Sequence, residues 1–406
     1  MKSLFLVDRG IEYSYETLLT DINKAEVYFP YFQQNNIYVY FLNLILALVE
    51  DQPLTLIDAD VNISEVEEDA VRLINQPVVL QPRCFKNIEE VLERVVRSGS
   101  EISIFTSGTT GQPKKIIHTL FSLTRTVRVA ENYKGQIWGY AYNPTHMAGL
   151  QVFFQAFENL NTMVNIFNMS RLEIYHQIET KKITHISATP TFYRLLLPPE
   201  KNYPFVKRIT LGGEKSDSKL YESILKIFPG AKINNIYAST EAGALFASKG
   251  EYFQIPMSIM DKIKIEKDEL LIHKSLLGYS DYFVFAGEYY CTGDLIEWID
   301  QESGTFRFKN RKNELINVGG YKVNPNEVEE CILQIPDVLQ VMVYGKANSV
   351  LGNILCAELK LIPGSQLTEI YIRSYLSKKL QDFKIPRRIK FVESISLTRT
   401  GKIKRR

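Results

Sequence analysis

The sequence has few cysteines and no long apolar run, and these absences exclude several classes of protein. Its four cysteines stand far apart without a CxxC pair, so we expect neither a zinc site nor a disulfide framework. Its five histidines lack the spacing of metal ligands. The longest apolar run, residues 37–49, is too short to span a membrane. Residues 1–10 lack the pattern of a signal peptide, so we expect a cytoplasmic protein.

A dominant charge is absent as well. The 48 basic and 46 acidic side chains leave a formal net charge of +2, which provides no bulk attraction to nucleic acid or to a membrane surface. We therefore expect no nucleic-acid partner and no integral membrane segment. With 406 residues, 45% of them hydrophobic, and no low-complexity tract, the chain can hold two or more domains and bury a sizeable core.

Short strand-like and helix-like segments alternate along the chain, which predicts a layered α/β fold. Ser14 and Asn87 are expected to cap the helices that follow them. Glycine turns such as Gly212-Gly213 recur between elements, as in doubly wound sheets. The segments predicted to be helical are 88–97, 122–133, 172–182, 219–228, 325–333 and 370–379, and those predicted to be strands are 102–105, 137–142, 205–211, 263–265, 269–273, 282–285, 338–344 and 354–361.

One stretch, residues 102–115, joins a predicted strand to a loop of hydroxyls, glycines and lysine. Gly108 and Gly111 free the backbone to bring amide N–H groups close to an anion, and Lys114 adds a mobile positive charge. These features favour a polyphosphate-binding loop, and the alternative is a solvated hairpin turn. The Walker A pattern is not met, because it needs four residues between its glycines.

Residues 106–114, Thr-Ser-Gly-Thr-Thr-Gly-Gln-Pro-Lys, resemble the signature loop of the adenylate-forming (AMP-forming) acyl ligase superfamily, which includes acyl-CoA and aryl-CoA synthetases. The resemblance implies a large N-terminal domain of layered mixed α/β subdomains with a distorted β-barrel-like part, expected over 1–312, and a small mobile α+β domain over 313–406. The stretch before the loop is shorter than in the family, so we expect a reduced N-terminal subdomain. The loop would bind the pyrophosphate part of ATP through Thr106, Ser107, Gly108, Thr109, Thr110, Gly111 and Lys114.

Residues 235–241 resemble a second motif of the superfamily, Asn-x-Tyr-Gly-x-Thr-Glu, with Ala238 where glycine is usual. An ordinary turn capped by a hydroxyl is the structural alternative. The resemblance implies one role for each residue type. Tyr237 would stack on adenine, Asn235 would read the edge of the base, Thr240 would meet the α-phosphate, Glu241 would hold Mg²⁺, and the upstream Gly213 and Glu214 would also contact the nucleotide.

Residues 288–294 and 310–323 resemble two further motifs. The first departs from the family at Glu288, where glycine is usual, and the second at Asn313, where the hinge aspartate is usual. The resemblance implies that Asp294 binds the ribose hydroxyls and that Arg311 binds ribose or phosphate. Thr-Gly-Asp is also good turn chemistry, so a plain hairpin loop is the alternative. The small domain would rotate about Asn313, and the loop serving the thiol half-reaction would comprise Gly319, Gly320 and Tyr321.

His146 follows the predicted strand 137–142, at the kind of strand end where α/β sheets bind ligands. Without the resemblance, a core or loop histidine is the favoured interpretation. The resemblance implies that His146 borders the acyl pocket and gates the adenylation site. Residues 132–157 contain no Asp or Glu to pair a substrate ammonium, so we expect an acid other than an amino acid. The expected pocket residues are His146, Met147, Gly149, Ala188, Gly212 and Ala238.

Residues 384–406 carry nine Lys or Arg and one Glu, a run that usually means a solvated face. Its end resembles the terminal motif of the superfamily, which implies that Lys402 meets the carboxylate and phosphate during adenylation. The implied reaction activates a carboxylic acid with ATP and Mg²⁺ to acyl-AMP and transfers the acyl group to a thiol. CoA is the expected acceptor, a carrier protein is the alternative, and a non-catalytic nucleotide-binding relative is a further alternative.

Overall fold

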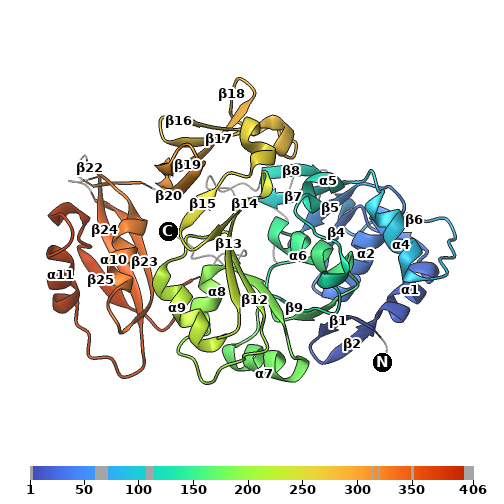
Figure 1. The fold of residues 1–406 in the computed structure, drawn as a ribbon, viewed down its shortest axis with the longest axis horizontal. Coiled ribbons are helices and arrows are strands. Elements are labelled where there is room, and N and C mark those ends of the chain that lie inside the picture. Colours follow the sequence, from blue (N-terminus) through green and yellow to red (C-terminus); the bar gives the residue numbers. More distant parts are fainter. Residues whose placement is uncertain are drawn as a thin grey trace.

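A computed structural model describes residues 3–59, 72–106, 114–312, 315–318, 321–348 and 352–396. Figure 1 shows a large body that holds most of the chain and a smaller lobe, at the left, that holds its C-terminal part. This is the mixed α/β architecture that the sequence predicts. No helix within the described ranges is long and apolar enough to cross a membrane.

A 14-stranded sheet forms the centre of the large body. Most strands of its parallel half are short and buried, because helices cover parallel sheets on both faces. In spatial order these strands are β1 (Leu4–Asp8), β10 (Thr162–Asn165), β9 (Ile137–Tyr140), β11 (His185–Ala188), β12 (Arg208–Gly212) and β13 (Lys232–Ser239), with β2 (Ile11–Ser14) antiparallel at the edge.

The other half of this sheet is antiparallel and begins where β14 pairs with β13. Figure 1 shows this half at the centre and top of the molecule. Its strands β19 and β20 form an antiparallel hairpin that turns at residues 301–304. The strands in spatial order are β14 (Gly243–Lys249), β15 (Tyr252–Gln254), β20 (Thr305–Arg311), β19 (Tyr289–Asp300), β17 (Glu269–His273) and β16 (Ile263–Glu266), while β18 (Phe285–Ala286) also pairs with β19.

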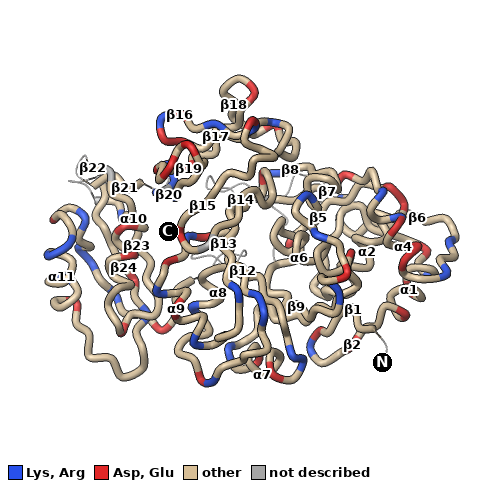
Figure 2. Tube along the Cα trace, in the orientation of Figure 1, with Lys and Arg blue, Asp and Glu red and all other residues tan. Residues whose placement is uncertain are grey.

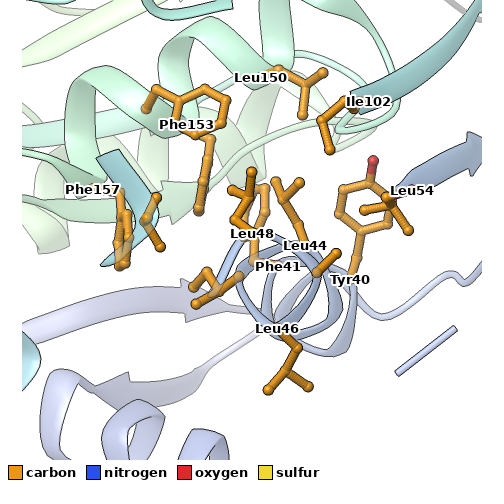
Figure 3. Close-up of a cluster of buried hydrophobic side chains, with 14 of the residues drawn as sticks. Tyr40, Phe41, Leu44, Leu46, Leu48, Leu54, Ile102, Leu150, Phe153 and Phe157 are labelled. Atoms are coloured by element: carbon orange, nitrogen blue, oxygen red, sulfur yellow. The ribbon is translucent and has the colours of Figure 1, made fainter. Parts of the chain in front are cut away.

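A second, four-stranded sheet holds the predicted phosphate-loop strand. Its order is β4 (Tyr31–Gln33), β5 (Leu54–Ile57), β7 (Glu101–Thr106) and β8 (Lys114–Thr119), and the pair β3 (Val27–Tyr28) and β6 (Val78–Val79) lies apart from it. The apolar run of residues 37–49 forms the buried helix α2 (Ile37–Val49). Figure 3 shows its side chains packed against Leu150, Phe153 and Phe157 of α6 (Met147–Phe157).

The helix caps agree with the sequence pattern. Ser14 caps α1 (Tyr15–Lys24) by accepting from Thr17 N, and Asn87 caps α4 (Ile88–Val96) by accepting from Glu90 N. The other helices of the large body are α5 (Leu120–Thr124), α7 (Arg171–Lys181), α8 (Pro190–Leu195) and α9 (Ser218–Ile227), and short 3₁₀ turns span Glu131–Tyr133, Met257–Lys262 and Lys274–Leu276.

Two predicted elements were wrong in extent. The helix predicted over 122–133 ends at Thr124, because the chain is then held by tertiary contacts: Gln155 and Asn159 of the α6 region donate to the Arg128 carbonyl, and Gln155 accepts from Arg128 N. β-branched residues at 124, 126, 127 and 129 also disfavour a helix there. The strand predicted over 282–285 is only Phe285–Ala286, because pairing with β19 begins at Phe285.

The smaller lobe is an α+β unit with its own core. It contains β22 (Tyr321–Val323), β21 (Ile316–Val318), β24 (Gly352–Leu361), β23 (Val338–Asn348) and β25 (Arg388–Phe391), together with α10 (Pro325–Leu333), α11 (Glu369–Ser377) and a 3₁₀ turn at Asp382–Lys384. Figure 2 shows basic stretches beside α11. Arg387, Arg388 and Lys390 are exposed there, as expected for a solvated face.

Polar contacts join the smaller lobe to the large body. Lys215 forms an ion pair with Glu330 at 2.6 Å, and Lys219 of α9 donates to the carbonyl of Leu333 and, at 3.3 Å, to that of Ile335. These carbonyls belong to the C-terminal end of α10, where a cation is favourable.

Candidate active site

Three residues from three strands form the centre of the candidate site. The Tyr237 hydroxyl of β13 donates to Asp294 Oδ2 at 2.6 Å, and Arg311 Nε of β20 donates to Asp294 Oδ1 at 2.7 Å. Asp294 and Arg311 lie opposite each other in the pairing of β19 with β20. The structure therefore brings together three residues that belong to separate motifs of the sequence.

The Tyr237–Asp294 contact requires a curved sheet. β13 and β19 are four strand spacings apart in the hydrogen-bonding order, which is about 19 Å in a flat sheet. A 2.6 Å contact means that this end of the sheet curls strongly, as the expected barrel-like part requires. The curl creates the cluster, because no two neighbouring strands could supply all three side chains.

The cluster is electrostatically coupled. Asp294 is only 13% exposed. The negative charge of Asp294 is the main cause that raises the pKa of Arg311, against the opposing effect of burial. Burial and then Asp294 raise the pKa of the Tyr237 hydroxyl well above its ordinary value. The Asp294 side chain is therefore held by one charged guanidinium and one phenol that keeps its proton.

The ring of Tyr237 is already stacked on protein. Its centroid lies 4.5 Å from that of Phe308 and 5.5 Å from that of Phe246, with interplanar angles of 19° and 20°. These contacts fix the plane of the ring. Its expected stacking on adenine stays a prediction.

The other residues expected near the nucleotide lie around β12 and β13. Asn235 is buried on β13, and its amide donates to the Tyr221 hydroxyl at 3.4 Å. Glu214 accepts from the backbone N–H and hydroxyl of Thr191 at the start of α8. Gly213 has a φ of +82°, a conformation that disfavours a side chain.

Glu241 has the properties expected of a magnesium ligand. Glu241 is half-buried, and its carboxylate makes no hydrogen bond or ion pair to the parts of the chain that the structure describes. Within those same parts, no three His, Cys, Asp or Glu side chains gather to hold a metal. Because Mg²⁺ commonly binds one or two carboxylates together with substrate phosphates, a single oxygen ligand of this kind fits an ion that arrives with ATP.

A second cluster surrounds His146, which precedes α6. Its Nε2 lies 3.2 Å from Asp58 Oδ2 without well-aligned hydrogen-bond geometry. Asp58 Oδ1 accepts from Asn143 Nδ2 at 2.8 Å and from the Thr145 hydroxyl. Burial acts to raise the pKa of Asp58, but the neighbouring His146, Thr145 and Asn143 outweigh it, so this pKa is lowered.

Asp58 was not predicted as a site residue. Its position changes the expectation that the segment around His146 has no acidic side chain nearby. Residues 132–157 contain no acidic side chain, but the fold brings one to them from the end of β5. The absence of Asp and Glu from that segment therefore does not leave the pocket without a carboxylate. Only the position of Asp58 after a buried strand, where ligand sites occur in α/β sheets, could have indicated it.

The expected pocket residues differ in their surroundings. Met147 and Ala188 are buried, Ala238 is half-buried, and Gly212 lies near Tyr142, whose hydroxyl would be 3.7 Å from an added Cβ. An added Cβ at Gly149 would lie 2.3 Å from the Asn143 carbonyl oxygen and 2.6 Å from the Tyr140 hydroxyl. Close packing of α6 against the end of β9 therefore requires glycine at this position.

Several expected site residues lie outside the described residues. They are Ser107, Gly108, Thr109, Thr110, Gly111, Asn313, Gly319, Gly320 and Lys402, and the side chain of Thr106 is likewise not described. The strands that flank the loop are described, and Thr106 pairs with Lys114 at the end of β7 and β8. Lys114 Nζ lies 5.8 Å from the centroid of Tyr282. Tyr321 is exposed on β22.

Two histidines outside the predicted site are buried and neutral. Burial lowers the pKa of both His118 and His185 to about 4. His185 is 7% exposed, and its ring centroid lies 5.0 Å from that of Trp138, so this histidine packs in the core.

Both histidines are expected to make stability depend on pH. The unfolded state binds more protons between the folded pKa of about 4 and the ordinary value of 6.5, so this contribution is complete above pH 6.5 and is lost as the pH falls toward 4. The loss is on the order of 2–3 kcal/mol per histidine. Urea unfolding of the wild type and of His185→Gln at pH 7, 5.5 and 4.5 measures this loss for His185. The quantity to compare is the free energy of unfolding of the wild type minus that of the variant at each pH.

The comparison with His185→Gln is needed because Glu158 changes the stability of the wild type with pH in the opposite direction. Burial raises its pKa to about 7, so this residue stabilises the fold as the pH decreases. His176→Gln, at an exposed histidine, is the matched control. A wild-type minus His185→Gln difference that does not change with pH contradicts the assignment of a buried neutral ring.

When the sequence is compared with known proteins, its large N-terminal part and its C-terminal part match domains of the same enzyme family. Residues 66–264 match the AMP-binding enzyme family, and residues 327–402 match the AMP-binding enzyme C-terminal domain. A 2-succinylbenzoate–CoA ligase of Staphylococcus aureus (strain MRSA252) is 25% identical over 327 residues, covering 74% of this chain and 65% of the relative. The chain thus spans about two thirds of the length of that relative.

Solved structures share the fold at low sequence identity. The o-succinylbenzoate CoA synthetase from Bacillus subtilis, in complex with its acyl-adenylate intermediate, has a TM-score of 0.70 and 19% identity and covers 99% of this chain and 94% of its own. The amide bond synthetase McbA from Marinactinospora thermotolerans has a TM-score of 0.74 and 17% identity, with coverages of 99% and 96%. The two family matches, in the order expected along the sequence, show that this chain belongs to the AMP-binding enzyme family.

Proposed function

We propose that this protein activates a carboxylic acid with ATP to give acyl-AMP and pyrophosphate, and then transfers the acyl group to a thiol, with CoA as the acceptor. The supporting observation is the Tyr237–Asp294–Arg311 cluster. The paired strands β19 and β20 supply two of its residues and the distant strand β13 supplies the third, and each residue belongs to a different motif. The family match and the CoA-ligase relatives support the same assignment.

In the first half-reaction, a substrate carboxylate oxygen bonds to the α-phosphorus of ATP, and the bond to pyrophosphate breaks. The substrate supplies the nucleophile, so the protein needs to position the groups and neutralise charge. We assign Asp294 to the ribose, Thr240 to the α-phosphate, and Lys402 to the reacting oxygens. Mg²⁺ bound through Glu241 would neutralise phosphate charge, and residues 106–114 would hold the departing pyrophosphate.

In the second half-reaction, the thiol displaces AMP from the acyl carbon. We propose the boundary between the large and small domains at residues 312 and 313, with rotation about Asn313 exchanging Lys402 for the loop containing Gly319, Gly320 and Tyr321. The contacts between α9 and α10 are compatible with such movement. They are one ion pair of Lys215, which precedes α9, and hydrogen bonds of Lys219, and water can replace these contacts of partly exposed lysines at small cost.

The substrate is proposed to be an acid without an α-amino group. Asp58 is the acidic side chain found beside His146, but its oxygens already face Asn143, Thr145 and His146. A substrate ammonium would have to displace one of these partners, and burying the ammonium without a carboxylate is costly. An uncharged alkyl or aryl substituent in place of the amino group carries no such requirement.

ATP–pyrophosphate exchange with a panel of acids tests this function. We expect exchange with one class of simple acyl or aryl acids and background rates with the amino acids. Subsequent addition of CoA or of a phosphopantetheine-bearing carrier protein identifies the acceptor. An amino acid that outperforms all simple acids contradicts the substrate class, and no exchange across a broad panel favours a non-catalytic nucleotide-binding protein.

A further inference from the structure

Three consecutive carbonyls, those of Thr240, Glu241 and Ala242, are each held by a donor from elsewhere in the chain. His118 Nε2 lies 2.8 Å from the Thr240 oxygen, and Gly278 N donates to the Glu241 oxygen at 2.8 Å. Arg125 Nη1 donates to the Ala242 oxygen at 3.3 Å. We call residues 240–242 the carbonyl turn.

The donor from His118 is a neutral imidazole. The residue is fully buried, and burial lowers its pKa to about 4. A carbonyl only accepts, so Nε2 carries the ring proton, and Nδ1 faces the Ser122 hydroxyl at 2.9 Å. The ring is therefore oriented from both sides.

Gly278 makes room for this ring. A Cβ added at Gly278 would lie 2.6 Å from His118 Cε1 and 2.7 Å from the Ile117 carbonyl oxygen. Arg125 links the same two segments. Its Nη2 donates to the Leu276 carbonyl at 2.9 Å, and its Nη1 donates to the Ala242 carbonyl. Residues 276–278 and the carbonyl turn are thus joined through Arg125 and through the Gly278–Glu241 hydrogen bond, and His118 packs beside this junction.

The same segment is tied to the strand that flanks the phosphate loop. Ile117 of β8 and Tyr279 exchange two backbone hydrogen bonds of 2.8 Å, and the Ser280 hydroxyl donates to the Lys115 carbonyl at 2.6 Å. His118 lies on β8 itself. The carbonyl turn and the base of the loop are therefore parts of one hydrogen-bonded unit.

We propose that His118 and Arg125 are positioning residues, which hold the backbone of the carbonyl turn so that the Thr240 hydroxyl and the Glu241 carboxylate face the phosphates and the magnesium ion. This inference rests on the proposed roles of Thr240 and Glu241. Neither His118 nor Arg125 needs to touch the nucleotide. A small displacement of a positioned group is enough to reduce a rate strongly, because reacting atoms must be held within a fraction of an ångström.

Substitutions at His118 separate positioning from packing. Gln places its side-chain N–H at nearly the reach of His Nε2, whereas Leu fills a similar volume and has no donor. We expect His118→Leu to raise the half-saturating Mg²⁺ concentration and lower kcat for ATP–pyrophosphate exchange, each by about tenfold. The KM for the carboxylic acid stays unchanged, and His118→Gln returns both values to within about threefold of the wild type.

His185→Leu is the matched control, since it removes a second buried neutral histidine that does not contact the carbonyl turn. It is expected to lower the Tm with normal Mg²⁺ dependence. Equal kinetic effects of His118→Leu and His185→Leu, or an effect of His118→Leu on Tm alone, overturn the proposal. If His118→Leu does not fold, Arg125→Met takes its place, with Arg125→Lys as its conservative partner.

Failure of the proposed function remains distinguishable from failure of this inference. A wild-type protein without exchange activity contradicts the function, whereas calorimetric titration with MgATP still tests the positioning. Weaker MgATP binding by His118→Leu, restored by His118→Gln, supports the proposal. Equal MgATP binding by the wild type and His118→Leu overturns it.

Discussion

Replacing Lys402 with alanine is expected to abolish acyl-adenylate formation while sparing thioester formation from supplied acyl-AMP. The first step spreads negative charge over the α-phosphate and the attacking carboxylate, and a lysine ammonium neutralises it. Removing such a group typically lowers the rate by about 10²- to 10³-fold. The second step uses another orientation of the small domain in our proposal, so it does not need this ammonium.

Separate assays of the two half-reactions measure this difference. Exchange of pyrophosphate into ATP reports adenylation, and release of AMP from supplied acyl-AMP in the presence of CoA reports thiol transfer. Lys404→Ala, two residues further along the same basic run, is the matched control and should leave both rates near those of the wild type. If Lys402→Ala reduces both half-reactions equally, the alternation of the small domain between two states is contradicted.

Replacing Asp294 with alanine is expected to weaken nucleotide binding and to destabilise the fold. The substitution removes the acceptor of both Tyr237 and Arg311. A buried polar group left without its partner costs about 1–3 kcal/mol, and the lower end applies to Arg311, whose side chain is 42% exposed and keeps contact with water. A carboxylate has about four acceptor positions, so Asp294 can also bind ribose hydroxyls, and losing these bonds should raise the KM for MgATP by roughly 10- to 100-fold.

Two substitutions control for the Asp294 effect. Asp294→Asn keeps an oxygen acceptor for one partner but not the charge, so an intermediate effect is expected. Asp300→Asn changes an exposed carboxylate on the same strand and should alter neither quantity. Urea unfolding gives the stability difference, and initial rates at varied MgATP give the KM. A full effect on stability with an unchanged KM for MgATP contradicts the assignment of Asp294 to the ribose.

Local sequence patterns predicted most elements because their causes are local. Ser14 and Asn87 cap the helices that follow them, and the apolar run 37–49 is a buried helix. The prediction over 122–133 was wrong, because side chains from the α6 region determine the conformation around Arg128. Contacts of this kind join residues far apart in sequence, so a pattern read along the chain does not contain them.

The residues of the candidate site also fall into those that local motifs predict and those that only contacts between distant segments reveal. Tyr237, Asp294 and Arg311 were predicted from motifs, but Asp58, His118 and Arg125 were not predicted. Nothing in the local sequence distinguishes His118 and Arg125 from ordinary core or surface residues, and Asp58 differs from such residues only by its position after a buried strand. Asp58 acquires its role because β5 ends beside His146. His118 acquires its role because its strand packs against the carbonyl turn more than a hundred residues later.

The sequence alone determined the type of fold, the motifs and the family, because residue types at fixed spacings record which chemistry a loop can perform. Only the tertiary structure decided which side chains meet. The curled sheet joins Tyr237 to Asp294 across strands that would be about 19 Å apart if the sheet were flat. His118, buried and neutral, holds the carbonyl turn because desolvation favours the uncharged imidazole, and desolvation is a property of the packed protein.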